Sequence, residues 1–276
     1  MRTIAIANQK GGCGKTTTAV NVSAALAMLE QRVLLIDMDP QGHATLGFGY
    51  EPGAVKKTIY DVLVEPGFAI QGAILDTSIE WLDLVGANVL LSGAELDLVH
   101  LRRRQFVLKE KLSSLSGDYD ICVIDCPPSL GLLTLNALLA STDVVVPVQV
   151  HYYAMEGLKQ LFETAQVIRE RFAPCYVRFM GLLLTLAEDT NIFGREIQKQ
   201  MREYFGDMVF GTAIHRTVRL AEAPSAGQPV LTYAPKSKGA AEYMALAEEI
   251  VDNIRRTATA ERDPEVSLPI VGSMAV

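Results

Sequence analysis

A glycine-rich segment near the amino terminus constrains the fold of this 276-residue chain more than any other feature. Residues 9–17 contain three glycines and two lysines, Lys10 and Lys15, and they end in two threonines. The segment lies between an apolar run, residues 3–8, that predicts a β-strand and an amphipathic stretch that predicts a helix. A strand, a glycine-rich turn and a helix in this order are typical of a phosphate-binding loop.

The backbone of such a loop explains its chemistry. Glycines allow successive backbone N–H groups to turn inward toward phosphate oxygens, and the following helix adds the positive end of its dipole. Lys15 can reach the β- and γ-phosphates of a nucleotide, and the Thr16 hydroxyl can bind Mg²⁺. The predicted nucleotide-binding residues of the loop are Lys10, Gly11, Gly12, Cys13, Gly14, Lys15, Thr16 and Thr17.

Short apolar runs that predict strands alternate with longer helical patterns along the chain. The predicted strands are residues 3–8, 33–37, 82–85, 121–125, 144–148 and 179–185. Several are apolar throughout, as strands buried between two helical layers are. The alternation predicts a single doubly wound α/β domain over residues 1–256, a mostly parallel sheet with helices on both faces. Residues 257–276 are expected to form a flexible tail, because the helical periodicity fades after Arg256.

Two helices are predicted from their apolar periodicity. The helix after the loop repeats apolar residues at Ala19, Val22, Leu26 and Leu29. The last helix, from about residue 237, repeats them at Tyr243, Ala247, Ile250 and Ile254.

Aspartates stand at the ends of two predicted strands. Residues 33–37 end in Asp37, and Asp39 follows two positions later, so that both carboxylates point to the same side. Residues 121–125 end in Asp125. The carboxyl ends of parallel strands border the crevice in which α/β proteins bind ligands, and a carboxylate there can hold Mg²⁺, often through its water shell. The sequence therefore predicts that Thr16 and Asp125 hold Mg²⁺, and that Asp37 and Asp39 border the same crevice.

Composition limits the remaining functions. The chain is 49% hydrophobic and 21% charged, which excludes disorder for most of it. Its net charge of −7 means that any contact with nucleic acid must come from a local basic patch. Four cysteines in a chain of this length do not form a disulfide framework, and no apolar window reaches the ~20 residues of a membrane helix. A cytoplasmic protein is expected.

A basic stripe lies on a helix predicted near residues 191–205. The apolar face of that helix consists of Phe193, Ile197, Met201 and Tyr204. The opposite face carries Arg195, Lys199 and Arg202, and Arg219 follows further along the chain. These cations could meet a phosphate backbone electrostatically. The alternative is an ordinary solvated face, because Glu196 and Glu203 dilute the charge.

The loop departs from the common G-x-x-x-x-G-K-[ST] pattern, because Gln9 replaces the first glycine and Lys10 adds a second lysine. In this it resembles the deviant Walker A loop, K-G-G-x-G-K-[ST], of the ParA/MinD family of ATPases. Residues 34–42 and 123–130 are similar to the family segments L-L-I-D-x-D-P-Q-G and V-I-D-x-P-P-S-L. Residues 91–98, 218–225 and 233–240 resemble the small, Soj-like ParA group. The resemblance runs from residue 8 to about residue 243.

This resemblance implies an ATPase that acts as a dimerisation switch. Lys10 would reach the nucleotide of a partner subunit, Lys15 would bind the phosphates of its own, and Asp39 would orient or activate the attacking water. Asp37 and Asp125 would lie around Mg²⁺. The ATP-bound homodimer would bind double-stranded DNA nonspecifically on the nucleoid, and a ParB-like protein would stimulate hydrolysis. The chain starts directly at its first strand, so sequence-specific DNA recognition is not expected.

At some positions the sequence differs from the family's motifs, among them the positions expected beside the adenine. Residues 187–191 lack the arginine of the family's D-x-R-T-N stretch. His215 and Thr217 stand where the family often has Pro-Arg-Asn beside the base; we expect them to frame the adenine with different hydrogen bonds. Relatives position plasmids, chromosomes or other cargo.

Three other functions remain as alternatives. A MinD-like membrane-positioning ATPase needs a basic amphipathic carboxyl-terminal helix, but residues 266–276 hold no Lys or Arg and contain Pro269, so no membrane partner is expected. A reductase like the nitrogenase iron protein needs cluster thiolates, and Cys122 and Cys126 merely flank Asp125. A metabolic P-loop ligase or kinase shares the same fold.

Overall fold

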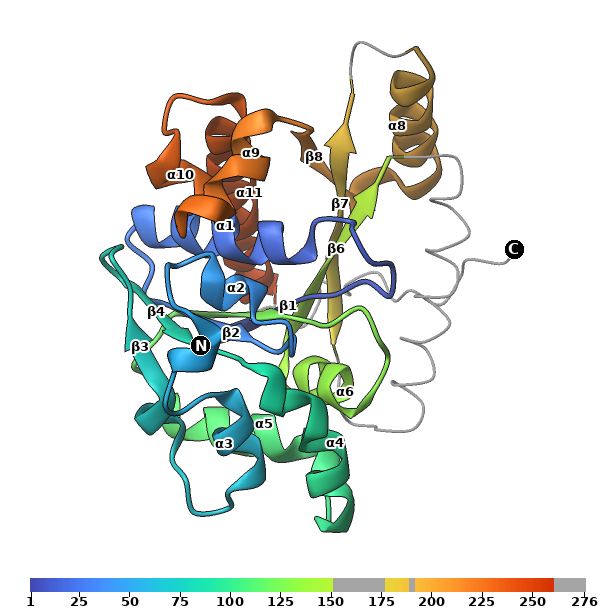
Figure 1. The fold of residues 1–276 in the computed structure, drawn as a ribbon. Helices are drawn as coiled ribbons and strands as arrows, with labels where there is room; N and C mark the ends of the chain where they lie inside the picture. The colour runs from blue at the N-terminus through green and yellow to red at the C-terminus, as the bar shows by residue number, and fades with distance from the viewer. Residues whose placement is uncertain (151–176, 189–191, 261–276) are drawn as a thin grey trace.

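Within residues 1–150, 177–188 and 192–260, which the computed structural model describes, an eight-stranded sheet forms the centre of the molecule (Figure 1). In spatial order its strands are β3 (Ile74–Asp76), β4 (Leu82–Val85), β2 (Val33–Asp37), β5 (Ile121–Asp125), β1 (Arg2–Ile6), β6 (Asp143–Gln149), β7 (Arg178–Ala187) and β8 (Val209–His215). Neighbouring strands in this part of the chain are parallel, except for the antiparallel edge pair β3–β4. The predicted doubly wound, mostly parallel sheet is confirmed.

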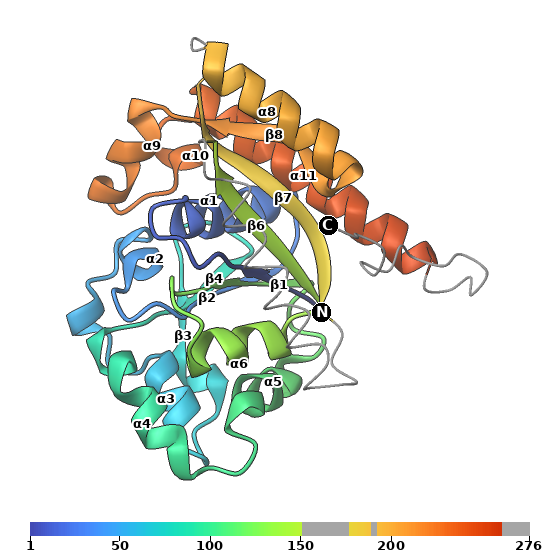
Figure 2. The ribbon, with the colours of Figure 1, turned by 90° about the vertical axis from the view of Figure 1, so that its right-hand side faces the viewer.

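Helices cover both faces of the sheet (Figures 1 and 2). One face carries α1 (Lys15–Met28), α2 (His43–Leu46), α9 (Val218–Glu222), α10 (Val230–Tyr233) and α11 (Lys238–Ala260). The other carries α3 (Ile59–Val64), α4 (Ala94–Asp97), α5 (Val107–Leu112), α6 (Leu132–Ala140) and α8 (Ile192–Phe205). Short 3₁₀ turns lie at Pro52–Ala54, Ile70–Ala73, Val89–Gly93, Leu98–His100, Arg104–Phe106, Ser113–Leu115, Gly206–Met208 and Ala223–Ala226.

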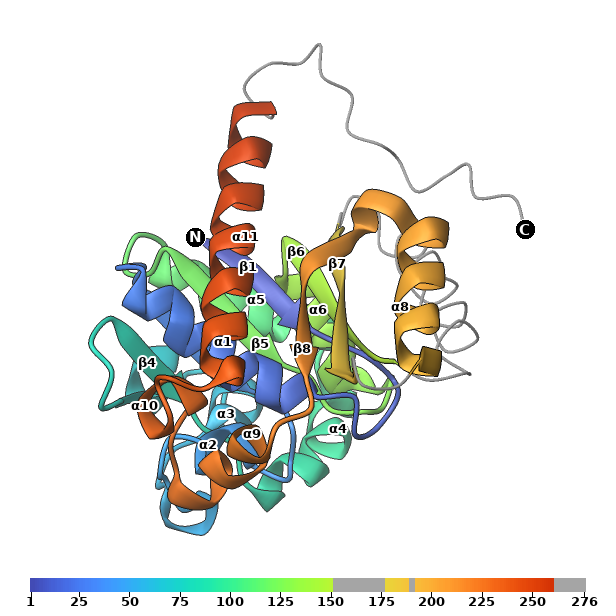
Figure 3. The same cartoon turned by 90° about the horizontal axis from the view of Figure 1, so that it is seen from above.

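An apolar core lies on each side of the sheet. Seen from above, α11 crosses α1, and α11 and α8 lie on opposite sides of β7 and β8 (Figure 3). The helical positions predicted from periodicity and buried in the α1–α11 core are Ala19, Val22, Leu26, Tyr243, Ala247 and Ile250. Leu29, which follows the last residue of α1, and Ile254 are only partly buried and pack against this core. These packed helices fix the start of α1, and with it the preceding loop.

The structure corrects several details of the sequence prediction. Strands β3 and β8 were not predicted: β3 is a three-residue edge strand, and Gly211 and Thr212 interrupt the apolar pattern of β8. On α8, Tyr204 is 60% exposed and Phe205 takes the buried position, so the predicted apolar face is wrong at its last residue. The side chain of Phe193 lies outside the described residues.

The carboxyl-terminal boundary also differs. Helix α11 continues to Ala260, past the predicted end at Arg256. The remainder of the predicted tail, residues 261–276, lies outside the described residues, and the tail stays a prediction.

Candidate nucleotide site

The glycine-rich loop connects β1 to α1 at the carboxyl end of the sheet. Gly12 and Gly14 have φ angles of 71° and 85°, in the left-handed region that favours glycine. A Cβ atom at Gly12 would meet nothing within 4 Å, so the backbone conformation, not crowding, requires glycine there. Gly14 caps the amino end of α1, whose first N–H groups therefore face the loop. This geometry provides the backbone donors of an anion site.

The ends of β6 and β7 hold the loop from one side. The Asn8 amide donates to the Pro147 carbonyl at 2.7 Å, and its Oδ1 accepts from the Lys10 backbone N–H at 3.0 Å. The Thr185 hydroxyl donates to the Cys13 carbonyl at 2.8 Å. Two neighbouring strands thus fix the loop at several points. Sequence reasoning missed these supports, whose only signal was a polar residue at the end of an apolar strand.

Both loop lysines are engaged within the protein. Lys15 is 7% exposed, and its ammonium donates to the Lys10 carbonyl at 3.0 Å. The Cys13 thiol donates to the same carbonyl at 3.2 Å. Lys10 is exposed at the mouth of the loop, where its ammonium donates to Gln149 Oε1 at 3.1 Å. One lysine therefore points into the loop, and the other lies at its rim.

Asp37 and Asp125 face each other across the adjacent strands β2 and β5, where they are register partners, and both are fully buried. Asp37 accepts hydrogen bonds from the Thr45 backbone and hydroxyl, at 2.9 and 2.7 Å, and from the Asp39 backbone at 3.1 Å. Burial raises the pKa of Asp37 to about 6, although the Thr45 hydrogen bonds oppose this rise. Through its hydrogen bonds to Thr45 and Asp39, Asp37 fixes the turn that leads into α2.

Asp125 differs, because neither of its carboxylate oxygens has a hydrogen-bond partner among the described residues. Burial raises its pKa well above the ordinary value, and the charge of Asp37 adds to this rise, while the nearby Thr16 hydroxyl and Lys15 ammonium oppose it. A buried carboxylate without partners is costly unless a cation binds it. Oxygen ligands of this kind suit Mg²⁺, so Asp125 and Thr16 fit the predicted metal site better than Asp37 does.

Asp39 follows β2 at the same edge of the sheet. It is partly exposed, and its Oδ1 accepts from the Gln41 backbone at 2.9 Å. Gly42 has a φ of 65°, and a Cβ atom there would lie 2.8 Å from Pro52. The tight turn after Asp39 therefore requires glycine and keeps the Asp39 carboxylate near the buried pair.

The predicted adenine residues lie at the end of β8, two strands beyond β6. The His215 backbone and Nδ1 contact the Glu242 carboxylate at 2.9 and 2.6 Å, which ties β8 to α11. The Thr217 hydroxyl accepts from the Leu220 backbone at 3.3 Å and caps α9. Both side chains thus have structural partners, and their role in adenine binding stays a prediction.

The predicted DNA-binding residues do not form one patch. Arg195 and Lys199 are exposed on α8, and Lys199 lies 3.7 Å from Glu203. Arg202 is partly buried and donates to the carbonyls of Phe210 and Gly211 at 2.8 and 3.0 Å, so it anchors α8 to β8.

Arg219 lies on α9, on the opposite face of the sheet, and pairs with Glu222 at 2.8 Å. The basic surface on α8 is therefore smaller than the sequence predicts.

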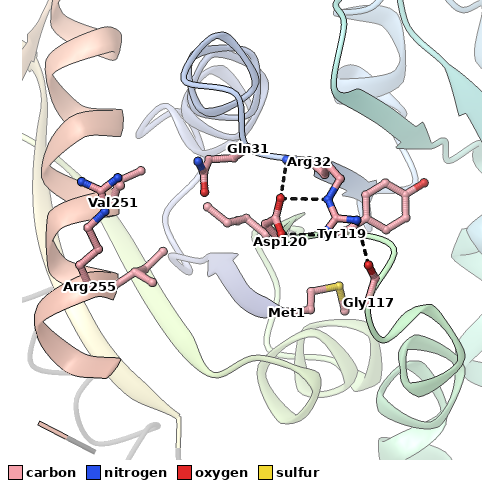
Figure 4. A pocket seen from close by; sticks show the side chains of 10 residues that line it. Met1, Gln31, Arg32, Gly117, Tyr119, Asp120, Val251 and Arg255 are labelled. Atoms are coloured by element: carbon pink, nitrogen blue, oxygen red, sulfur yellow. Dashed lines mark hydrogen bonds and ion pairs between the residues drawn. The ribbon is translucent and has the colours of Figure 1, made fainter. Parts of the chain in front are cut away.

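A pocket of about 300 Å³ lies at the opposite, amino-terminal edge of the sheet (Figure 4). Its wall includes Met1, Tyr119 and Arg255. The Arg32 guanidinium binds both oxygens of Asp120 there, at 3.1 and 2.8 Å. Ligands of α/β sheets bind at the carboxyl ends of the strands, so this pocket is separate from the nucleotide site.

The fold and loop define a class of protein, the P-loop nucleotide-binding proteins with a second lysine in the loop. Residues 1–175 match a family described as an AAA domain. The sporulation initiation inhibitor protein Soj of Bacillus subtilis is 47% identical over 250 residues, which cover 91% of this chain and 98% of Soj. The chromosome partitioning protein ParA of Myxococcus xanthus is 44% identical, with 91% and 88% covered. The chain belongs to the ParA/Soj family of partitioning ATPases, which confirms the resemblance.

Solved structures agree with this assignment. A cobyrinic acid a,c-diamide synthase from Mycobacterium smegmatis, with bound ATP analog and magnesium, is 34% identical, with a TM-score of 0.81 and 93% and 97% of the two chains covered. The cell division ATPase MinD of Pyrococcus furiosus is 25% identical, with a TM-score of 0.74 and coverages of 91% and 98%. In the part of the chain that the structure describes, no helix is long and apolar enough to cross a membrane.

Proposed function

We propose that this chain is a Mg²⁺-dependent ATPase whose ATP-bound form dimerises and binds double-stranded DNA nonspecifically. Hydrolysis, stimulated by a ParB-like partner, returns it to a monomer that releases DNA. The observation that carries this proposal is the pair of loop lysines, one buried in its own loop and one exposed at the rim. A second cation at the rim is accessible to a second nucleotide that approaches that face, whereas Lys15 is not.

The loop would bind ATP with groups already in place. The amino end of α1 and the loop N–H groups would receive the phosphates, and Lys15 would exchange the Lys10 carbonyl for phosphate oxygens. Asp125 and Thr16 would hold Mg²⁺, which neutralises charge on the phosphates when it is bound. Asp39, on the turn that Asp37 and Gly42 fix, would orient the attacking water.

Lys10 would make hydrolysis depend on the dimer. A lysine from the partner subunit adds positive charge where negative charge develops in phosphoryl transfer. The same contact couples the two subunits while ATP is intact. Loss of the terminal phosphate removes the anion that the partner's lysine binds, so that hydrolysis would separate the subunits.

The DNA surface would lie on α8. Arg195 and Lys199 are the exposed cations there, whereas Arg202 and Arg219 have protein partners and would contribute less. Two copies of α8 in a dimer double a charge that is weak in one subunit. DNA binding would therefore follow dimerisation, and the ATP-bound protein would accumulate on the nucleoid.

The test is DNA binding to a nonspecific duplex with ATP, with ADP and without nucleotide, across a salt series. We expect binding with ATP alone, and an Arg195→Ala/Lys199→Ala variant should have a log–log salt slope that is smaller by about 0.9 for each phosphate that it no longer neutralises. Lys56→Ala/Arg256→Ala removes the same charge from exposed positions elsewhere and serves as the control. Dimers that form with ATP but bind no DNA at low salt would contradict the proposal and favour membrane or protein partners.

A further inference from the structure

The exposed loop lysine is fastened to its own subunit through both its side chain and its backbone. Its ammonium donates to Gln149 Oε1 at 3.1 Å, and its backbone N–H donates to Asn8 Oδ1 at 3.0 Å. Asn8 in turn donates to the carbonyl of Pro147, two residues before Gln149 on the same strand. Both the side chain and the backbone of Lys10 are thus tied to the end of β6.

Gln149 is a firm anchor for this contact. It is the last residue of β6 and pairs in register with Thr185 of β7. The Val150 backbone continues this pairing by donating to the Thr185 carbonyl at 3.1 Å. Because Thr185 also binds the Cys13 carbonyl, the loop and the glutamine share one rigid support. The lysine cannot move far outward while it keeps the Gln149 contact.

We propose that Gln149 is a positioning residue that holds Lys10 on its own subunit and thereby opposes dimerisation. This inference rests on the proposed function, in which Lys10 crosses to the nucleotide of a partner. The ammonium must leave Gln149 before it can bind that nucleotide, so the hydrogen bond stabilises the monomer alone. An interaction present in only one of two states shifts the equilibrium between them by its own free energy. Gln149 therefore raises the concentration of ATP-bound protein at which dimers form.

Two variants move this equilibrium in opposite directions. Gln149→Ala removes the acceptor in both subunits, so that each dimer no longer gives up two hydrogen bonds when it forms. We expect the dimer dissociation constant, measured by sedimentation with a saturating non-hydrolysable ATP analogue, to fall about 5- to 100-fold. Gln149→Glu keeps the oxygen and adds a charge, and it should raise the same constant by a similar factor. Gln71→Ala removes an exposed glutamine far from the loop and should change nothing.

A second readout needs no dimer. The rate at which an acylating reagent modifies Lys10 in the nucleotide-free monomer, followed by mass spectrometry, should rise severalfold in Gln149→Ala, because the ammonium loses this acceptor. In a Lys10→Ala background, which we expect to be monomeric, Gln149→Ala should not restore a dimer, since the effect acts through the lysine.

Three results would overturn the inference. The first is a Gln149→Ala protein with unchanged Lys10 reactivity. The second is a dimer dissociation constant that is unchanged or higher in that variant. The third is a dimer that Gln149→Ala restores in the Lys10→Ala background. A wild-type chain that stays monomeric with the ATP analogue contradicts the proposed function itself and removes the role of Gln149 with it. The reactivity measurement still shows in that case whether the hydrogen bond exists, so the two failures are distinguishable.

Discussion

Thr185 offers the cleanest test of how the sheet positions the phosphate loop. Its hydroxyl donates to the Cys13 carbonyl at 2.8 Å, and the residue is 2% exposed. Its side chain also lies over Gly14, where an added Cβ atom would sit 3.8 Å from Thr185 Cβ and Cγ2. Thr185→Val keeps this shape and replaces the hydroxyl with a methyl group, which cannot donate a hydrogen bond.

The expected loss of stability follows from one buried hydrogen bond. Its loss should lower the free energy of unfolding by about 1–2 kcal/mol. If the loop then moves away from its support, the same free energy weakens nucleotide binding. A factor of ten corresponds to about 1.4 kcal/mol, so the ATP dissociation constant should rise by about fivefold or more. Titration with a fluorescent ATP analogue in Mg²⁺ measures this change, and thermal unfolding measures the stability.

Thr185→Ser is the matched control, because it keeps the hydroxyl and loses the methyl group. We expect its affinity for ATP to stay close to that of the wild type. The reasoning is refuted if Thr185→Val binds ATP as tightly as the wild type, or if Thr185→Ser is the weaker of the two. Either result would mean that packing, not the hydrogen bond to Cys13, positions the loop.

The remaining predictions concern single side chains of the site and of α8. Lys15→Ala should abolish ATP binding in calorimetry, because no other buried cation enters the loop within the described ranges; retained binding would mean that the loop is misinterpreted. Asp39→Ala should bind ATP but release no phosphate, and unchanged hydrolysis would remove Asp39 from its proposed role. Arg202→Ala should lower the free energy of unfolding by about 1–3 kcal/mol, since two carbonyls lose their charged donor. Arg195→Ala should leave stability within about 0.5 kcal/mol of the wild type, and equal losses in the two variants would contradict the assigned anchoring.

The central strands and the loop could be predicted because the local sequence pattern is enough to determine them. Residues 33–36 and 121–124 are apolar, and each run is followed by an aspartate. The segments 33–37 and 121–125 both form strands with the predicted bounds. The strand β8 escaped prediction because Gly211 and Thr212 depend on a distant residue. Glu249 on α11 accepts from both of their backbone N–H groups, at 2.8 and 2.7 Å. No local pattern reveals that interaction.

In the candidate site, too, some features follow from the local sequence and others depend on tertiary contacts. The loop residues and the aspartates follow from spacing along the chain, whereas the roles of Thr185 and Gln149 depend on how β6 and β7 lie beside β1. Helical periodicity correctly placed Arg202 outside the apolar face of α8 but could not show that β8 presents two carbonyls to it. Tertiary interactions decide whether a cation is a surface charge or an anchor, and periodicity alone does not contain them.

ATP joins two chains through Lys10 in the proposed function, and every later step depends on this contact. The most direct measurement is the molar mass of the Asp39→Ala protein in solution with ATP and Mg²⁺, with ADP, and in a Lys10→Ala background. We predict a dimer with ATP, a monomer with ADP, and a monomer with ATP when Lys10 is absent. A monomer under every condition, or a dimer that forms equally well with ADP or without Lys10, would contradict the account.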